Sequence, residues 1–260
     1  MSAVSLSVTI ITYNEEKNIA RCINSVKELA DEVLVVDSFS TDRTKEICQN
    51  LGVRFTEHAF EGHIQQKNYA VEQATYDYIL ALDADEALSA ELFRSVLATK
   101  NNWVHDAYRF NRLTSYCGRW IHHCGWYPDT KLRMWNRTRG KWAGENPHDS
   151  VKMREGSTLH RLKGDLLHYS FHSIQDHANT ANRFSEIASD EAIRKNRKVN
   201  LVIHVILNPI FTFVKKYFFQ LGFLDGYYGL VVCVLSAYSN FLKYSKIYSK
   251  YRTLSSPLST

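Results

Sequence analysis

The first hundred residues alternate apolar, β-type runs with stretches of helical spacing, and this alternation constrains the fold more than any other feature. The apolar runs are short and carry charge only at their ends, as in Leu6–Tyr13, Glu32–Asp37 and Tyr78–Leu82. Between them, apolar residues recur every three or four positions, which is the periodicity of helices. Strands that alternate with helices of this length are typical of a parallel, doubly wound sheet. We therefore predict an α/β chain whose first strands are parallel.

The middle of the chain has a different pattern. All five tryptophans fall within residues 101–172, among short β-type pieces such as Ala107–Arg112 and Lys131–Trp135. We expect this part to extend the sheet as mixed strands joined by long loops. Ser173 then precedes an amphipathic stretch that reaches Lys195, and an aromatic, basic tail follows. The expected organisation is a body in two parts, residues 1–100 and 101–197, and a helical tail, residues 198–260.

The net charge of +5 conceals an uneven distribution. From Arg194 to the end there are ten Lys or Arg residues and one acidic residue, against 22 and 26 in the preceding part. The same tail holds 13 of the 28 Phe and Tyr residues. A nucleic-acid-binding protein is typically basic along a whole face, so we expect no nucleic-acid partner.

Two nearly uncharged stretches of the tail, Val199–Val214 and Gly226–Leu242, are 16 and 17 residues long. They are at or below the length that spans a hydrocarbon core of ~30 Å. Tyr and Phe interleaved with Lys suit the membrane interface, where rings lie at headgroup depth and cations meet anionic lipids. We therefore expect a tail that associates with a membrane surface. A pair of core helices packed on the body is the alternative.

The N-terminus and the cysteines bear on the cellular compartment. The first residues lack a basic segment, and glutamates follow a short apolar run, so we expect no signal peptide. The five cysteines are odd in number and scattered, as in proteins of a reducing compartment. These features predict a cytoplasmic protein, and the tail adds the expectation that it is associated peripherally with the cytoplasmic face of the inner membrane.

Asp83-Ala84-Asp85 is the central chemical signal. It follows the apolar run Tyr78–Leu82, and ligands of an open α/β sheet bind at the carboxyl ends of its strands. Two carboxylates there suit Mg²⁺ or Mn²⁺, which prefer oxygen ligands and bridge carboxylates to substrate phosphates. By itself the pair is equally typical of an acidic turn before the helix that Ser89 caps. Glu15 and Asp37 lie at the ends of two other strands, and three such strand ends together favour a ligand site.

Several motifs resemble family 2 glycosyltransferases of the GT-A fold. They are Val8–Glu16 (VTIITYNEE), Val35–Asp42 (VVDSFSTD), Gln66–Asn68 (QKN) and Leu82–Glu86 (LDADE). Others are similar to the lipopolysaccharide core β-glucosyltransferases of the WaaE/KdtX and LgtF type: Gly125–Asp129 (GWYPD), Lys131–Arg133 (KLR), Leu166–Tyr169 (LLHY) and Leu221–Gly226 (LGFLDG). The resemblance spans nearly the whole chain. It implies a Rossmann-like, doubly wound, mostly parallel sheet with a mixed extension and a C-terminal helical tail.

The resemblance also implies an activity and roles for individual residues. The activity is the inverting, metal-dependent transfer of a hexose, with UDP-glucose as the expected donor, to the inner core of lipopolysaccharide. Residues 1–100 would bind the nucleotide sugar and residues 101–197 the acceptor. The positions that match nucleotide-sugar ligands are Tyr13, Glu15, Asp37, Lys67 and Asp83. Asp85 matches the ligand of a divalent cation, Mg²⁺ or Mn²⁺, and His168 is a second candidate ligand.

Inversion by direct displacement requires a carboxylate that deprotonates the acceptor hydroxyl. Asp149, in a His-Asp pair, stands where related sequences carry a His-Glu pair, and Glu145 competes with it for this role. Sugar rings stack on aromatic faces, and Arg suits a phosphorylated group. The candidates for binding the acceptor are Trp126, Asp129 and Arg133. The expected acceptor is a lipid-linked oligosaccharide at the inner membrane surface.

Two alternatives share parts of this pattern. A polyprenyl-phosphate glycosyltransferase, or another glycolipid glycosyltransferase of the same fold, would keep the donor site and differ in its acceptor. A haloacid-dehalogenase-type phosphatase also carries two aspartates after a strand. In that class the pair follows the first core strand and continues to Thr or Val, whereas here Glu86 and Ala87 follow what we expect to be the fourth strand.

Overall fold

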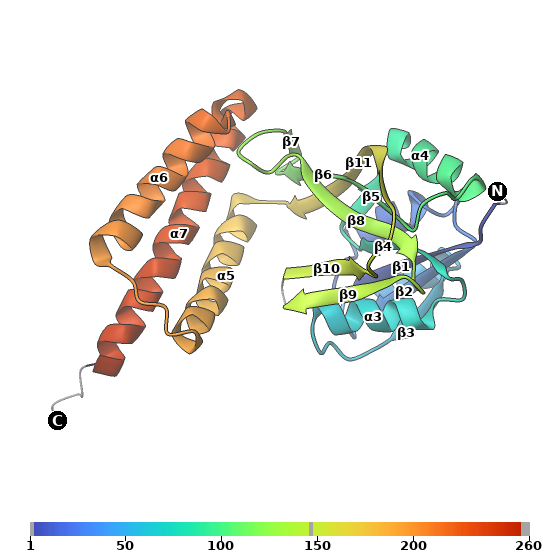
Figure 1. Ribbon diagram of the computed structural model, residues 1–260, viewed down its shortest axis with the longest axis horizontal. Coiled ribbons are helices and arrows are strands. Elements are labelled where there is room, and N and C mark those ends of the chain that lie inside the picture. The colour runs from blue at the N-terminus through green and yellow to red at the C-terminus, as the bar shows by residue number, and fades with distance from the viewer. Residues whose placement is uncertain (1–2, 146–147, 256–260) are drawn as a thin grey trace. The chain divides into compact units, whose positions relative to one another are not determined.

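The computed structural model describes residues 3–145 and 148–255 (Figure 1). The chain divides into two compact units. The first unit comprises Met1–Leu113 and Pro128–Tyr169, and the second comprises Thr114–Tyr127 and Ser170–Thr260.

The first unit is built on a mixed sheet whose first strands are parallel. In spatial order these are β3 (Arg54–Glu57), β2 (Glu32–Asp37), β1 (Leu6–Thr12) and β4 (Tyr78–Asp83). The helices that connect or follow them are α1 (Ile19–Asn24), α2 (Thr44–Asn50), α3 (His63–Gln73) and α4 (Ala90–Asn101). Ser89 caps the N-terminus of α4, where its Oγ accepts a hydrogen bond from the Leu92 backbone N at 3.2 Å, as the sequence predicts.

The sheet continues beyond β4 with strands of mixed direction. Their order is β8 (Asp129–Asn136), β6 (Ala107–Tyr116), β11 (Leu159–Phe171) and β5 (Glu86–Leu88). In this part β4 and β8, β8 and β6, and β11 and β5 pair antiparallel. β9 (Gly140–Glu145) and β10 (His148–Met153) form a separate antiparallel pair. The predicted fold class is confirmed: a doubly wound sheet with parallel first strands, a mixed extension and a C-terminal helical tail.

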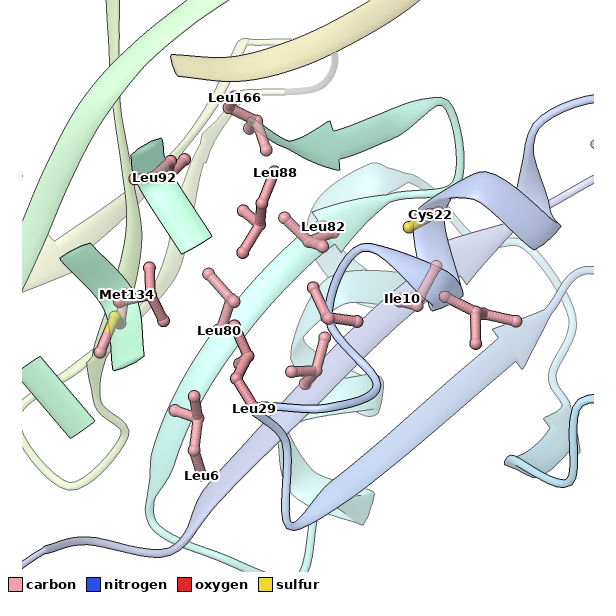
Figure 2. Close-up of a cluster of buried hydrophobic side chains, with 14 of the residues drawn as sticks. Leu6, Ile10, Cys22, Leu29, Leu80, Leu82, Leu88, Leu92, Met134 and Leu166 are labelled. Atoms are coloured by element: carbon pink, nitrogen blue, oxygen red, sulfur yellow. The ribbon is translucent and has the colours of Figure 1, made fainter. Parts of the chain in front are cut away.

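The parallel strands bury side chains on both of their faces. In β4, Leu80 and Leu82 join the large core cluster with residues of α1 and α4, whereas Ile79 and Ala81 pack with residues of α3 and with two buried tryptophans. Figure 2 shows Leu80 and Leu82 among leucines from neighbouring elements. This burial on both faces explains why the first strands are continuous apolar runs without alternation.

The second unit is mostly helical. It contains α5 (Ile174–Arg194), a helical segment over residues 201–219 and α7 (Gly226–Ser255), with the short strand β7 (Arg119–Ile121) paired to the end of β6. The segment over residues 201–219 comprises η1 (Leu201–Leu207), α6 (Asn208–Val214) and η2 (Lys215–Phe219), and the turn η3 (Gly222–Asp225) precedes α7. α5 and α7 lie side by side in Figure 1. Lys250 of α7 pairs with Glu186 and Asp190 of α5.

The Leu221–Gly226 motif forms a tight corner in the second unit. The carboxylate of Asp225 accepts a hydrogen bond from the His123 backbone N at 2.8 Å, and the ring Nδ1 of His123 lies 2.9 Å from it. A Cβ added to Gly222 would lie 2.7 Å from the Sγ of Cys233, so a larger residue would not fit there. The motif therefore fixes the loop before Trp126 to the start of α7.

A buried histidine makes the second unit sensitive to acid. His177 lies against the rings of Tyr116 and Phe171, and burial, with a smaller contribution from Lys216, lowers its pKa to about 4. The pKa in the unfolded chain is about 6.5. Between these values the unfolded chain binds a proton that the folded chain does not, so the free energy of unfolding falls as the pH drops from about 6.5 towards 4.

We expect a loss of about 2 to 3 kcal/mol across this range in the wild type, and a flatter pH dependence in the variant His177→Gln. The measurement is denaturant unfolding followed by tryptophan fluorescence at a series of pH values. An equally steep pH dependence in His177→Gln would assign the acid sensitivity to other groups.

Candidate active site

The carboxyl ends of β1, β2 and β4 meet at one edge of the sheet. Thr12 pairs with Asp37 and Ile11 pairs with Asp83 in the parallel registers. Tyr13 follows β1 directly, and its side chain is 58% exposed. The polar residues that follow these three strands therefore lie at a common edge, as the alternation of strands and helices predicts.

The loops after β1 and β2 bind each other. Asp37 is fully buried, and its carboxylate accepts a hydrogen bond from the Ser40 backbone N at 2.7 Å. The backbone N of Glu15 donates to Thr44 Oγ1 at 2.9 Å. Burial raises the pKa of Glu15 to about 7, although Asn18 donates to its carboxylate at 2.8 Å and opposes this shift. Near neutral pH, Glu15 is therefore partly protonated and can donate as well as accept a hydrogen bond.

Lys67 joins two carboxylates that are distant in the sequence. Its Nζ lies 2.7 Å from Asp149 Oδ2 and 3.0 Å from Asp83 Oδ1. The Lys67 side chain is 7% exposed and its Nζ lies 4.6 Å from the centroid of the Trp142 ring. The two carboxylates compensate for the water that this buried amine has lost.

Arg133 extends this network. Its Nη2 lies 2.7 Å from Asp83 Oδ2 and 2.8 Å from Glu86 Oε1, and its side chain is 3% exposed. Burial by itself would raise the pKa of Asp83, but the charges of Arg133 and Lys67 outweigh it and hold that pKa well below its usual range. Asp83 therefore remains ionised.

Arg112 links the network to the rim of the sheet. Its Nη2 lies 2.8 Å from Asp129 Oδ2, and Lys131 Nζ lies 3.0 Å from Asp129 Oδ1. The side chain of Arg112 is 22% exposed and that of Lys131 is 37% exposed. These two cations are thus more accessible than Lys67 and Arg133.

A cavity of about 460 Å³ opens among these residues. The charged residues that line it are Lys67, Asp83, Arg112, Lys131, Arg133 and Asp149. The cations in the lining outnumber the carboxylates, which suits a ligand that carries negative charge. The volume is in the range of small-molecule sites.

Asp85 and His168 form a second pair at the same strand end. His168 Nε2 lies 3.1 Å from Asp85 Oδ2, and the Tyr169 backbone N donates to the Asp85 carbonyl at 2.8 Å. Burial opposes ionisation of Asp85, but the neighbouring His168 outweighs it and lowers the pKa of Asp85. A carboxylate beside an imidazole is a donor set that suits Mn²⁺, and Mg²⁺ less well.

The protein offers a small number of donors for such an ion. Over residues 3–145 and 148–255, no group of three or more His, Cys, Asp or Glu side chains is arranged to hold a metal. Mg²⁺ is commonly bound by one or two carboxylates, with water and substrate phosphates as its other ligands. Asp85 and His168 therefore fit an ion that is bound together with a diphosphate.

Several predicted site residues are thus brought together in the first unit. Lys67, Asp83 and Asp149 form one ion-pair network, which Arg133 and Asp129 extend through Glu86 and Arg112. Trp126 belongs to the second unit, where its ring packs against Tyr116 and Phe171. The backbone of Glu145 pairs with that of His148, but both side chains lie outside the described residues.

Three further residues lie at the site and were not predicted from the sequence: Glu86, Arg112 and Trp142. Glu86 adjoins the two aspartates and is 1% exposed, so its position directly after Asp85 was the available signal. Arg112 and Trp142 come from strands whose pairing brings them to the site, and nothing in their local sequence marks them.

Comparison with known proteins identifies the family. Residues 7–153 match the family described as glycosyl transferase family 2. An uncharacterized glycosyltransferase of Rickettsia typhi is 32% identical over 93% of this chain and 86% of its own length. The lipopolysaccharide core biosynthesis glycosyltransferase LpsC of Rhizobium meliloti is 27% identical over 97% and 95%. Among solved structures, S. aureus TarS 1–349 in complex with UDP-GlcNAc matches 96% of this chain and 92% of its own, with 15% identity and a TM-score of 0.47.

The assignment rests on the sequence matches, since the family covers more than half of the chain and the Rickettsia relative covers nearly all of it. The two aspartates after β4, the loops after β1 and β2, and Lys67 all lie within the matched residues. This chain is a member of glycosyl transferase family 2 and an enzyme that transfers sugars.

Proposed function

We propose that the protein transfers a hexose, glucose in the first instance, from UDP-glucose to the inner core of lipopolysaccharide, with inversion at the anomeric carbon. The observation that carries this proposal is the convergence of Lys67, Asp83 and Asp149 beside the Asp85–His168 pair. In this proposal the donor site and the catalytic base belong to one unit. The name of the LpsC relative supports the core of lipopolysaccharide as the acceptor class.

The donor side of the proposed site is the edge after β1, β2 and β4. Tyr13 offers an exposed ring on which a base can stack, and Glu15 offers a carboxyl that can donate or accept. Asp37 holds the loop after β2 through Ser40, and Asp83 and Lys67 lie further along the edge. We assign these five residues to the nucleotide sugar.

Asp85 and His168 are the protein ligands that we assign to a divalent cation. When bound, such an ion offsets the negative charge that develops on the departing nucleoside diphosphate. The low pKa of Asp85 keeps this carboxylate ionised and ready to bind the ion.

Asp149 is the general base of the proposed reaction. Its carboxylate removes the proton from the acceptor hydroxyl as that oxygen attacks the anomeric carbon from the side opposite the diphosphate. The ion pair with Lys67 holds Asp149 Oδ2 and leaves Oδ1 for the acceptor. Glu145, on the neighbouring strand β9, is the alternative base.

Arg133 and Asp129 are the acceptor residues that we assign in the first unit, with Arg112 and Lys131 as accessible cations beside them. This charge suits an acceptor that carries phosphate. Trp126 stays a prediction, since its ring belongs to the second unit. A polyprenyl-phosphate acceptor is the second candidate, because its phosphate, whose oxygen would then attack the anomeric carbon and displace the nucleoside diphosphate, would meet the same cations.

The test is a panel of nucleotide sugars with Mg²⁺ or Mn²⁺ and a core-lipid acceptor, read as release of nucleoside diphosphate and as mass gained by the acceptor. We expect turnover with UDP-glucose and the core lipid. Transfer to a polyprenyl phosphate in place of the core lipid would favour the second candidate. Transfer to neither acceptor would contradict the proposal.

The proposed acceptor is anchored in a lipid bilayer, so we also propose that the enzyme works at the cytoplasmic face of the inner membrane. Within the described residues, the segment Leu201–Phe219 is long and apolar enough to cross a membrane by length and composition, and 6% of its apolar window is buried. We assign this segment to the surface of the membrane, because it is held along one side to the rest of the second unit.

A further inference from the structure

The segment over residues 201–219 is held to the second unit along one side. Thr212 Oγ1 accepts a hydrogen bond from Asn240 Nδ2 of α7 at 2.7 Å, and Lys216 Nζ donates to the Cys124 carbonyl at 2.8 Å. Phe213 and Tyr217 pack against the buried cluster around Tyr116. The segment is therefore a fixed part of the second unit.

The other side of this segment is apolar and exposed. The side chains of Ile203, Leu207, Ile210, Phe211, Phe218 and Phe219 are between 52% and 79% exposed, and we call this set the apolar face. Scattered single apolar residues are ordinary on a protein surface, but a contiguous set of this size marks an interaction site.

α7 presents a second exposed stripe in its first half. Tyr227, Leu230, Val234, Tyr238 and Phe241 are between 38% and 65% exposed. Their spacing of three, four, four and three residues places them on one side of the helix. We call this set the α7 stripe. α6 and α7 lie side by side in Figure 1.

The charges that remain exposed near these residues are positive. Asp225 is the sole acidic residue of the sequence after Arg194, and its side chain is 6% exposed and bonded to His123. Arg197, Lys198 and Lys215 are exposed. The lysines of the C-terminal half of α7 are used differently, since Lys246 pairs with Glu186 at 3.0 Å and Lys250 pairs with Asp190 at 2.6 Å.

We infer that the apolar face and the α7 stripe form a lipid-binding surface whose partner is an anionic bilayer. This inference deepens the proposed function, which places the acceptor in a membrane, by identifying the residues that dock. Apolar and aromatic side chains would enter the headgroup region, while the exposed cations contact anionic lipids. A second copy of this chain is a poorer partner, because it would bring the same positive charges to the interface.

The surface that docks is therefore not the basic end of α7. The run of Lys and Tyr residues after Leu242 has the composition of a membrane anchor, but α5 neutralises Lys246 and Lys250. Their contribution is to hold α5 against α7, and an anionic headgroup would have to displace carboxylates to reach them.

The experiment is flotation of the full chain with vesicles of phosphatidylglycerol and phosphatidylethanolamine. We expect the wild type to float, and the double variant Phe218→Glu, Phe219→Glu to bind roughly a hundredfold more weakly, about tenfold per ring removed. The matched control is Phe60→Glu, which changes a ring of the first unit that is 53% exposed, and it should float like the wild type. Lys246→Gln, with its folding checked by thermal unfolding, should also float.

Other outcomes would overturn the inference. These are flotation of the double variant at wild-type strength, loss of flotation in folded Lys246→Gln alone, or equally strong binding to vesicles of phosphatidylcholine. A wild type that forms dimers and does not float would assign the surface to a second copy. Transfer to a core oligosaccharide without its lipid, measured in parallel, separates the two proposals: flotation without any transfer would contradict the proposed function and leave the lipid-binding surface standing.

Discussion

Replacing Asp149 by Asn is expected to lower sugar transfer by a factor on the order of 10² to 10⁴ while leaving donor binding nearly unchanged. The amide cannot take a proton from the acceptor hydroxyl, which removes general-base catalysis. Its oxygen can still accept from Lys67 Nζ, which lies 2.7 Å from Asp149 Oδ2, so the position of Lys67 is retained. The measurements are nucleoside diphosphate release with acceptor present, and the Kd of UDP-glucose from calorimetry.

Two companion variants make this result specific. Ser150→Ala changes the next residue, which lines the same cavity and is exposed, and it should bind the donor like the wild type. Glu145→Gln tests the competing carboxylate. Transfer that survives in Asp149→Asn and disappears in Glu145→Gln would move the base to Glu145. Loss of donor binding in Asp149→Asn would show that Asp149 supports the donor site and would contradict its assignment as the base.

The part of the site that follows from local sequence is the edge of the parallel strands. The apolar run Glu32–Asp37 coincides with β2, and the run Tyr78–Leu82 coincides with β4 except for Asp83 at its end. Strands buried on both faces are continuous apolar runs, so their ends are visible in the sequence. Once the strands are parallel, the residues after them must lie at a common edge, and Asp83 and Asp85 could be placed there before any contact was known.

The antiparallel side of the site depends on pairing that the sequence does not display. The register between β6 and β8 shifts at Tyr108 and Arg109, so the two-residue alternation of β6 does not tell which face Arg112 occupies. The role of Arg133 was also only partly predictable from the sequence. As a basic residue in a polar motif it was predicted to bind the acceptor, and the structure adds that Asp83 and Glu86 bury its guanidinium, so it also fixes the strand end.

In the tail, the composition predicts the positive charge correctly but does not predict which of the charged side chains are exposed. The positive charge after Arg194 is a property of the sequence, but which cations face outward depends on the packing of α5 against α7. Glu186 and Asp190 lie about sixty residues before their lysine partners, and local patterns cannot pair them. The outward-facing positive charge is therefore smaller than the count predicts, and the exposed apolar residues carry more of the proposed membrane contact.

Replacing Asp85 by Asn is expected to raise the concentration of Mn²⁺ that gives half-maximal turnover by about a hundredfold or more, and to lower turnover at saturating metal. The carboxylate supplies a full negative charge to the cation, and its lowered pKa keeps it ionised across the neutral range. Asn preserves the size of the side chain and an oxygen that can face His168. The weaker metal binding and the lower turnover of this variant would therefore result from the missing negative charge. The measurement is turnover with UDP-glucose titrated with Mn²⁺ and with Mg²⁺ after treatment with a chelator.

Two further variants make the metal titration specific. His168→Gln tests the second ligand, and Asp129→Asn is the control. His168 Nε2 lies 3.1 Å from Asp85 Oδ2, so its replacement should also shift the Mn²⁺ midpoint, with a smaller shift for Mg²⁺, which imidazole binds less well. Asp129 pairs with Arg112 and Lys131, so Asp129→Asn should leave the metal midpoint where it is, whatever its effect on the acceptor. If Asp85→Asn needed the same Mn²⁺ concentration as the wild type for half-maximal turnover, the assignment of the cation to this strand end would be wrong. The two aspartates after β4 would then act through Asp83 alone, with Lys67 and Arg133 as the groups that meet the charge of the diphosphate.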